Sequence, residues 1–401
     1  MAYAVSSWFV DQTLASVAPI RQLILPDTAG SVTYTDRVTR WPDYRRRYDQ
    51  VSPGTITAVL ANEDGHFNYL RSTKATMTGT AALQIGYTHP TSGPEMVTLA
   101  QGTISAINFG DGAVTVTVMD KWKKLTETVV GDTSSPVLFT GSNYLVSDVA
   151  WWLVTSYGVG YSAVNSTSNP DIHWADFQAW ASVFSENNTR IQARFDGVKT
   201  SEALRRIARY TDSAIYIAEN KVRFKNFAAY DVPAMSLNDD NMTSVNVRWD
   251  DEETINNQYV YGLYDSTSNA WGLNVLAVAS VSVSSWGVRM AVEKDDKIWY
   301  TDSVSCLFLA QRRVAAYGDP HETFQVGGTL APIVRQIGDT VSITDELFGV
   351  SSGETWRILG FGYDLNTGKS TIEASGYELL IPFTLDDSAN GLLDQNYNFL
   401  L

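Results

Sequence analysis

The chain has 401 residues, with 44 acidic and 29 basic side chains and a formal net charge of −15 at pH 7. This charge argues against a groove binder of duplex nucleic acid, which needs a net basic face. A hydrophobic fraction of 44% with only 18% charged residues is typical of a globular protein, and the length is sufficient for two or three domains.

Short strands with alternating apolar and polar residues dominate the pattern. Four of them cover residues 55–60, 113–118, 340–344 and 370–374. Turn residues join strand-like runs at 110–112, 219–221 and 366–368. This spacing predicts a mainly β protein built of antiparallel barrels or sandwiches, and it argues against a doubly wound parallel sheet.

Three helices are predicted, at residues 148–157, 200–210 and 303–317. On the second helix, Leu204 and Ile207 form the buried stripe, whereas the arginines at 205, 206 and 209 face water. A hairpin over residues 214–224 follows, and we expect the helix to pack on it. The longest uncharged run, residues 266–288, alternates in its middle, which predicts β structure in water and not a membrane-spanning helix.

The sequence lacks the residue patterns that are typical of catalytic and metal-binding sites. The single cysteine, Cys306, excludes an intramolecular disulfide and a cysteine-based zinc site, and its place on the apolar face of the third helix predicts a buried structural thiol. The four histidines show no metal-ligand spacing, and neither a Gly-x-Ser-x-Gly elbow nor a phosphate-binding glycine loop occurs. We therefore predict no enzyme activity, no catalytic site, no cofactor and no metal.

Adjacent acidic residues occur at 239–240, 250–253, 295–296 and 386–387. Glycoside hydrolysis needs two carboxylates that face one cleft, but neighbours on an extended chain point to opposite faces. Solvated turn or edge-strand charge is the favoured interpretation. The 12 tryptophans leave a carbohydrate-binding function open, although core or interface packing explains most of them.

A basic run stands out in this acidic chain. Arg45, Arg46 and Arg47 are flanked by Tyr44 and Tyr48. Because arginine and tyrosine are enriched at interfaces, the three arginines are candidate interface residues that would clamp carboxylates of another subunit. A solvated loop is the alternative.

A weak internal repeat relates two hairpins. Gly112-x-x-Thr115-Val116 and Gly368-x-x-Thr371-Ile372 each follow a strand-like run. Two related barrels would leave such a repeat, but hairpins are common enough that chance is the alternative.

Several segments resemble the bacteriophage tail-tip or baseplate hub family. The opening at 35–38, 48–49 and 54–67, with its Asn-x-Asp-Gly-x-Phe turn, is similar to the start of these proteins. Residues 334–344, 356–358 and 366–369 resemble their second barrel, and residues 200–224 resemble their inserted α+β domain. The resemblance covers most of the chain from about residue 23 to 380.

This resemblance implies a structural protein with two tail-tube-like β-barrels per chain and a homotrimeric ring of six barrels. The ring would join the hexameric tail tube to a trimeric spike or fibre at the distal end of the tail in the virion, and would form part of the DNA ejection channel. Implied partners are further copies of the chain, the tail tube or distal tail ring protein, the spike or central fibre protein, the tape-measure protein and passing DNA. Synthesis would take place in the cytoplasm of the infected bacterium.

The expected organisation has five parts. They are an N-terminal arm (1–22), a first barrel (23–120 with 236–262), an α+β insert (121–235), a second barrel (263–382) and a C-terminal tail (383–401). The alternatives are a carbohydrate-binding or glycosidase β protein, and a different ring component of the tail with one barrel and six-fold symmetry.

Two further groups of residues are candidate functional positions. An acidic lining would let DNA slide, so Asp239, Asp240, Asp295 and Asp296 are candidate lumen residues. In the tail, large apolar groups exposed to water would be a liability, which makes them candidate contacts to a neighbouring subunit or to the spike. These are Leu392, Leu393, Tyr397 and Phe399. A frayed end is the alternative.

Overall fold

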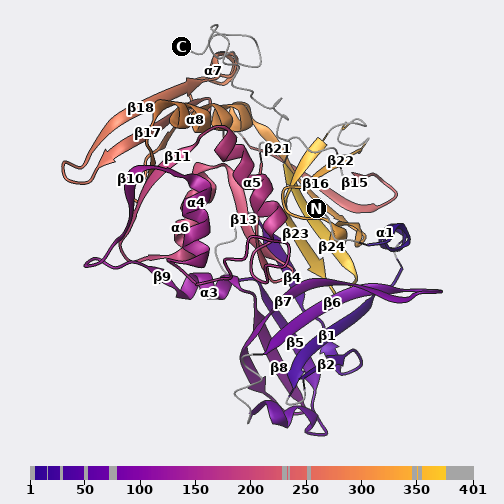
Figure 1. Ribbon diagram of the computed structural model, residues 1–401. Helices are drawn as coiled ribbons and strands as arrows, with labels where there is room; N and C mark the ends of the chain where they lie inside the picture. The colour runs from indigo at the N-terminus through magenta and orange to yellow at the C-terminus, as the bar shows by residue number, and fades with distance from the viewer. Residues whose placement is uncertain are drawn as a thin grey trace.

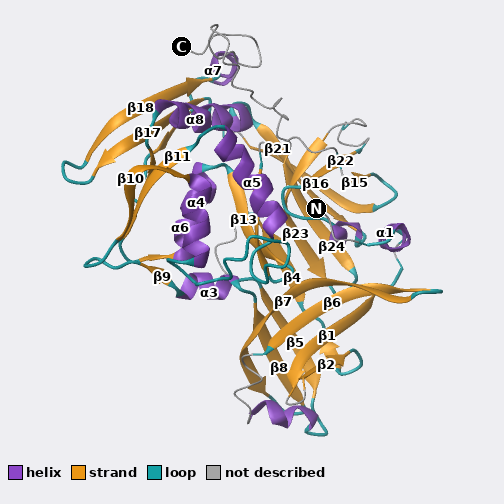
Figure 2. Ribbon diagram, in the orientation of Figure 1, coloured by secondary structure: helices purple, strands orange, loops and turns teal. Residues whose placement is uncertain are grey.

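The computed structural model describes residues 5–15, 17–27, 30–48, 53–71, 79–227, 233, 235–250, 254–345, 350 and 355–375. The chain is mainly β, as predicted. Its described strands form three large sheets, and most of the helices gather around the middle one (Figures 1 and 2).

The first sheet is antiparallel and uses the N-terminal part of the chain. Its strand order is β2-β1-β6-β7-β8-β5-β3. The strands are β1 (Ile20–Asp27), β2 (Gly30–Tyr34), β3 (Val38–Arg40), β5 (Thr55–Ala61), β6 (Thr80–His89), β7 (Gly93–Phe109) and β8 (Ala113–Met119). Apolar residues alternate toward one face, so that Ile56, Ala58 and Leu60 of β5 are all buried.

A second sheet lies next to the first and is built mainly from the C-terminal part of the chain. Its main path runs β15-β22-β23-β24-β21-β16, and β4 pairs with β23. The strands are β4 (Asp43–Arg47), β15 (Met235–Leu237), β16 (Met242–Asp250), β21 (His321–Gly328), β22 (Thr340–Ile343), β23 (Thr355–Asp364) and β24 (Lys369–Ser375). We call it the C-terminal sheet. Helix α1 (Ser7–Leu14) and the short helices η1 (His66–Arg71) and η2 (Ala331–Val334) contribute buried residues to the core of these two sheets.

One apolar core joins the first sheet to the C-terminal sheet. Residues of both, such as Leu83, Val116, Phe324 and Ile372, belong to the same buried cluster. This shared core couples the two sheets, because separating them would expose buried apolar surface to water at a free-energy cost of about 25 cal/mol per Å².

The middle module, residues 121–227 and 254–320, has its own core. Its strands are β9 (Val129–Val130), β10 (Val137–Leu145), β11 (Arg190–Phe195), β12 (Val198–Lys199), β13 (Ser213–Ala218), β14 (Lys221–Asn226), β17 (Asn257–Asp265), β18 (Ala270–Val278), β19 (Met290–Glu293) and β20 (Ile298–Tyr300). Its helices are α3 (Trp122–Glu127), α4 (Val146–Thr155), α5 (Trp174–Glu186), α6 (Thr200–Tyr210), α7 (Ser280–Trp286) and α8 (Ser303–Tyr317). We call its large sheet the middle sheet; the strand order is β10-β11-β20-β17-β18, and β19 pairs with β17.

The β13–β14 hairpin separates the two cores. Ala214 and Tyr216 of β13 contact the core shared by the first and C-terminal sheets, whereas Ile215 and Ile217 contact the core of the middle module. Successive side chains of a strand point to opposite faces, so a strand between two apolar layers is buried throughout. This explains why every residue of β13 is buried.

The structure corrects the expected domain boundaries. Residues 236–262 do not return to the first sheet, since β15 and β16 belong to the C-terminal sheet and β17 to the middle module. Of residues 263–382, the segment that contains β18, β19, β20 and α8 also belongs to the middle module. Alternation identifies a strand, but it carries no information on which distant strand is its neighbour.

The three predicted helices are present as α4, α6 and α8. Asp302 is the N-cap of helix α8, and its carboxylate accepts the backbone N–H of Ser305 at 2.7 Å. The expectation of β structure over 266–288 is correct only as far as Val278, because α7 follows at Ser280–Trp286. Its valines and serines alternate, so periodicity alone favoured a strand there.

The internal repeat corresponds to two hairpins in the two coupled sheets. Gly112 precedes β8 and Gly368 precedes β24, each in a turn after a long strand of its sheet. Their φ angles of 68° and 71° lie in the left-handed region, which glycine adopts without steric cost. The shared turn glycine therefore has a physical reason in both places.

We expect Cys306 to resist alkylation in the folded chain. It lies on α8 with no exposed surface, and burial raises the pKa of its thiol to about 12, so the reactive thiolate is suppressed. Mass spectrometry after iodoacetamide treatment at pH 8 should detect no adduct on the native chain and one after unfolding in urea. Rapid labelling without urea would contradict the burial of this residue.

We expect Asp176 to contribute to stability in a pH-dependent way. Its carboxylate lies 2.8 Å from the buried Arg223 guanidinium and 3.0 Å from the His173 ring. Burial raises its pKa, but the hydrogen bond from His173 and the charge of Arg223 outweigh this and lower it below 3.8. Stability from this group is therefore present above pH 3.8 and is lost as the pH falls through the lower native pKa.

The variant Asp176→Asn tests this expectation. Urea unfolding at pH 7 should show a loss of about 1–3 kcal/mol, because the buried Arg223 charge loses one of its two carboxylate partners and keeps only Glu219. The difference from the unsubstituted chain should shrink as the pH falls below 3.8. The exposed Asp239→Asn is the control. A difference that stays constant with pH would show that the carboxylate charge is not responsible.

Candidate functional site

The arginine run forms strand β4 and connects the first sheet to the C-terminal sheet. Arg45, Arg46 and Arg47 pair in antiparallel register with Gly362, Phe361 and Gly360 of β23. The alternative of a solvated loop is therefore wrong. β4 belongs to the N-terminal part of the chain but is a strand of the C-terminal sheet. This short segment therefore joins the first sheet to the C-terminal sheet.

Arg46 lies inside the chain. Its guanidinium donates to the Tyr44 hydroxyl at 2.6 Å and to the Leu99 carbonyl at 3.2 Å, and it lies over the ring of Tyr216. It thus contacts β4, β7 and the β13–β14 hairpin together. The side chain is only 6% exposed, so Arg46 does not reach an outer surface where another subunit would bind.

The two neighbouring arginines point the other way. Arg45 is exposed, and Arg47 is half-exposed and forms a 3.0 Å ion pair with Glu373 of β24. Of the three candidate interface residues, Arg45 and Arg47 are placed where a neighbouring subunit could contact them. Their role at an interface stays a prediction.

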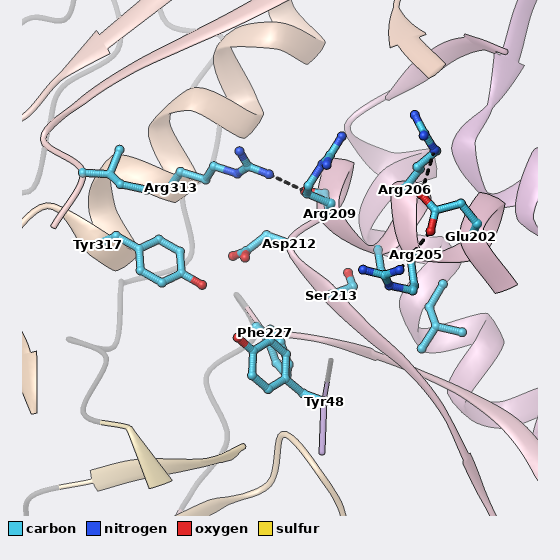
Figure 3. Close-up of a pocket in the computed structure, with 13 residues that line it drawn as sticks. Tyr48, Glu202, Arg205, Arg206, Arg209, Asp212, Ser213, Phe227, Arg313 and Tyr317 are labelled. Atoms are coloured by element: carbon cyan, nitrogen blue, oxygen red, sulfur yellow. Dashed lines mark hydrogen bonds and ion pairs between the residues drawn. The ribbon is translucent and has the colours of Figure 1, made fainter. Parts of the chain in front are cut away.

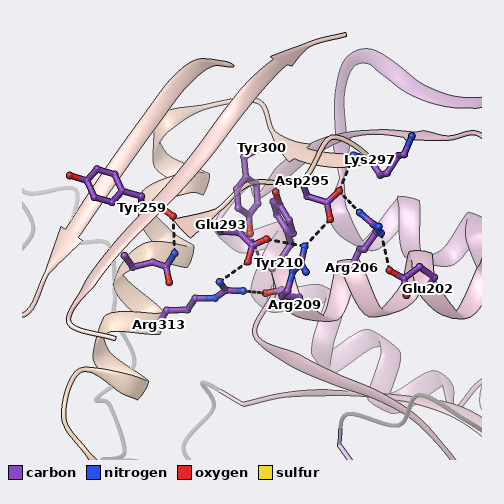
Figure 4. A network of polar contacts seen from close by, with 11 residues as sticks. Glu202, Arg206, Arg209, Tyr210, Tyr259, Glu293, Asp295, Lys297, Tyr300 and Arg313 are labelled. Atoms are coloured by element: carbon purple, nitrogen blue, oxygen red, sulfur yellow. Dashed lines mark hydrogen bonds and ion pairs between the residues drawn. The ribbon is translucent and has the colours of Figure 1, made fainter. Parts of the chain in front are cut away.

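A second arginine cluster joins α6 to the middle sheet (Figure 4). Arg209 lies 2.8 Å from Asp295 and 3.0 Å from Glu293, and Arg206 also pairs with Asp295. Arg313 of α8 lies 2.6 Å from Glu293. The network therefore connects α6, the end of β19 and α8.

Burial makes this network structurally important. The side chains of Glu293 and Asp295 are 6% and 1% exposed, and a carboxylate at such a depth needs charged partners. Burial lowers the pKa of Arg313, but the nearby Glu293 carboxylate outweighs this and raises it. The expectation that the arginines of α6 face only water is wrong for Arg206 and Arg209. Sequence spacing could not reveal these partners, which lie more than eighty residues away.

A groove borders this network (Figure 3). It has a volume of about 390 Å³ and lies where α6, α8, β13 and the residues that follow β4 and β14 come together. Its lining residues are Tyr48, Glu202, Arg205, Arg206, Ala208, Arg209, Asp212, Ser213, Ile215, Phe227, Ile255, Arg313 and Tyr317. Aromatic rings and arginines dominate this set.

The serine hydroxyl in the groove is not set up for nucleophilic chemistry. Ser213 Oγ accepts the indole N–H of Trp180 at 3.0 Å and donates to the Thr211 carbonyl at 2.9 Å. Activation of a serine requires a general base at its hydroxyl, and here a backbone carbonyl takes that place. The two acids of the groove are engaged as well, Glu202 with Arg205 and Arg206, and Asp212 with Arg312.

The candidate lumen residues occupy different environments. Asp239 and Asp240 are exposed in the turn before β16, and the Asp296 side chain is 58% exposed. Asp295 is buried in the arginine network, so it does not present its carboxylate to a channel. Of the tail candidates, Leu392, Leu393, Tyr397 and Phe399 lie outside the described residues.

Two features are absent from the described part of the chain. No group of three or more histidine, cysteine or acidic side chains there is arranged to hold a metal ion. No helix there combines the length and apolar character needed to cross a membrane.

Comparison with known proteins gives matches in structure only. No protein-family model and no curated protein sequence matches the chain. A tail protein from Neisseria meningitidis MC58 superposes with a TM-score of 0.55 at 12% identity, covering 90% of this chain and 96% of that one. The 43 kDa tail protein of prophage MuSo2 from Shewanella oneidensis gives 0.52 at 13% identity, with 88% and 98% covered.

A third match is prophage tail protein gp18 from Listeria monocytogenes EGD-e, with a TM-score of 0.52 at 12% identity and coverage of 88% and 94%. The chain has the fold of phage tail proteins. The match extends over nearly the whole of these tail proteins, so it includes the two coupled sheets and the middle module together. The resemblance seen in the sequence is confirmed at the level of the fold.

Proposed function

We propose that this chain is a structural protein of a phage-type tail and acts there as a homotrimeric hub. The observation that carries the proposal is the fold, which the chain shares with a tail protein over 90% of its own length. In this role three chains form a ring that joins the tail tube to a spike or fibre, and DNA passes through its lumen.

The arrangement of the sheets supports the proposal. The first sheet and the C-terminal sheet share one core and carry equivalent turn glycines at Gly112 and Gly368. Two related β units in one chain give six units in a trimer, which matches a six-fold tube on one face and a three-fold spike on the other. β4 and Arg46 would hold the two units in a fixed relation.

A hub lumen through which DNA slides should be acidic or neutral. The exposed Asp239, Asp240 and Asp296 suit such a lining, and the net charge of −15 is consistent with it. Asp295 is not part of this proposal because its carboxylate binds arginines. Tail tube or distal ring protein, spike or central fibre protein and tape-measure protein are the proposed partners, and the end of the virion tail is the proposed location.

Immunogold labelling of purified particles tests the location. An antibody raised against this chain should bind at the end of the tail in electron micrographs. Label distributed along the tube, or particles that lack the chain, would contradict the proposed role.

A further inference from the structure

The middle sheet has one covered face and one open face. Val260 and Gly262 of β17 point toward α8, where a Cβ atom on Gly262 would lie 2.9 Å from Cys306 Sγ. Neighbouring strand residues point to the opposite face, and the Tyr259 side chain points away from α8 (Figure 4). No described element covers this second face in the way that α8 covers the first.

The open face is apolar across three strands. Leu276 of β18 is in register with Tyr259 of β17, which is in register with Val292 of β19. Met290 lies one row further, opposite Asn257. Met290 is 64% exposed and Val292 54%. Trp286 at the end of α7 and Val288, just before β19, are exposed as well. A contiguous apolar patch of this kind marks a contact surface.

The end of the described chain lies close to this face. β24 ends at Ser375, whose hydroxyl donates to the Glu322 carbonyl at 3.4 Å. Glu322 lies four residues after Gly318, whose carbonyl accepts a hydrogen bond from Ser282 of α7. Four residues span at most about 14 Å. The chain therefore leaves β24 near α7, which connects β18 to β19 of the open face.

The segment that follows is suited to such a face. Residues 376–401 contain thirteen apolar or aromatic residues and four acidic ones, with no lysine or arginine. An extended segment of this length reaches about 85 Å, so reach is not limiting. Arg289 and Lys294 are both exposed at the two ends of β19, which places positive charge beside the apolar rows.

We propose that residues 376–401 dock on the open face formed by β17, β18 and β19 of their own chain. The apolar side chains of the segment cover the rows at Leu276, Tyr259 and Val292, and its acidic groups lie toward Arg289 and Lys294. The sequence had suggested a neighbouring subunit or the spike as the docking site, but the exit point at Ser375 favours the same chain. The inference is independent of the hub proposal.

Oxidation of Met290 by hydrogen peroxide, measured by mass spectrometry, tests this docking. A thioether is oxidised at a rate that follows its exposure. Met290 should oxidise about tenfold more slowly in the full chain than in a chain that ends at Ser375, since protection reflects the population of the docked state. Equal rates in the two chains would overturn the proposal.

A substitution on the face provides a test that does not remove the segment. Val292→Lys in the full chain should raise the oxidation rate of Met290 to that of the shortened chain. Leu138→Lys is the matched control, because Leu138 is 50% exposed on β10 at the other edge of the same sheet. Protection that persists in the shortened chain, or that disappears on dilution, would assign the face to a second copy and would contradict docking within the chain.

Discussion

Replacing Leu204 with aspartate is expected to lower the free energy of unfolding of the middle module by about 2–5 kcal/mol. Leu204 has no exposed surface and packs in the same core as Ile207 of α6 and Phe224 of the hairpin. A carboxylate at this position loses its hydration without gaining a partner. Urea unfolding followed by tryptophan fluorescence measures the loss.

The matched control is Arg205→Ala on the neighbouring position of the same helix. The Arg205 side chain is 45% exposed, and surface changes of this kind usually alter stability by less than about 0.5 kcal/mol. If Leu204→Asp unfolds at the same urea concentration as Arg205→Ala, α6 does not pack on the hairpin as described.

Replacing Arg46 with methionine is expected to weaken the joint between the two coupled sheets, by about 2–4 kcal/mol. Methionine fills a similar volume but cannot donate to the Tyr44 hydroxyl or to the Leu99 carbonyl. These acceptors lie on β4 and β7. Loss of the two hydrogen bonds therefore weakens the contact between β4, a strand of the C-terminal sheet, and β7 of the first sheet. Thermal and urea unfolding measure the effect.

Arg45→Met on the same strand serves as the control, because Arg45 is exposed and its replacement removes a charge without opening the core. Similar unfolding midpoints for the two variants would mean that the buried contacts of Arg46 do not hold the sheets together.

The sequence predicted local structure better than long-range pairing. Helix α8 could be placed because apolar residues recur on one of its faces and Gly318 follows its end. The hairpin turns at Gly112 and Gly368 were visible because a left-handed conformation selects glycine. Signals of this type depend on residues within one or two turns of the chain.

The assignment of strands to sheets required information that local patterns do not contain. β16 and β17 are neighbours in sequence, yet they belong to different sheets. Both alternate apolar and polar residues, so nothing in either strand specifies its partner. The same limit applied to the buried ions, since Asp295 resembles a solvated turn residue until Arg206 and Arg209 are placed beside it.

The arginine run shows the difference between what residue composition and what strand register can reveal. Tyrosine and arginine favoured a contact with another subunit, which stays a prediction for Arg45 and Arg47, whereas the strand itself pairs with β23 of its own chain. Alternation along β4 buries Tyr44 and Arg46 and exposes Arg45 and Arg47. The alternation along the strand assigns the four side chains to two opposite faces, and residue composition alone does not contain this information.

The mass of the purified assembly tests the hub proposal most directly. Native mass spectrometry of the full chain should give a species near three times the single-chain mass of 44.2 kDa. A stable monomer, or a six-membered ring, would contradict a trimeric hub with two tube-like units in each chain.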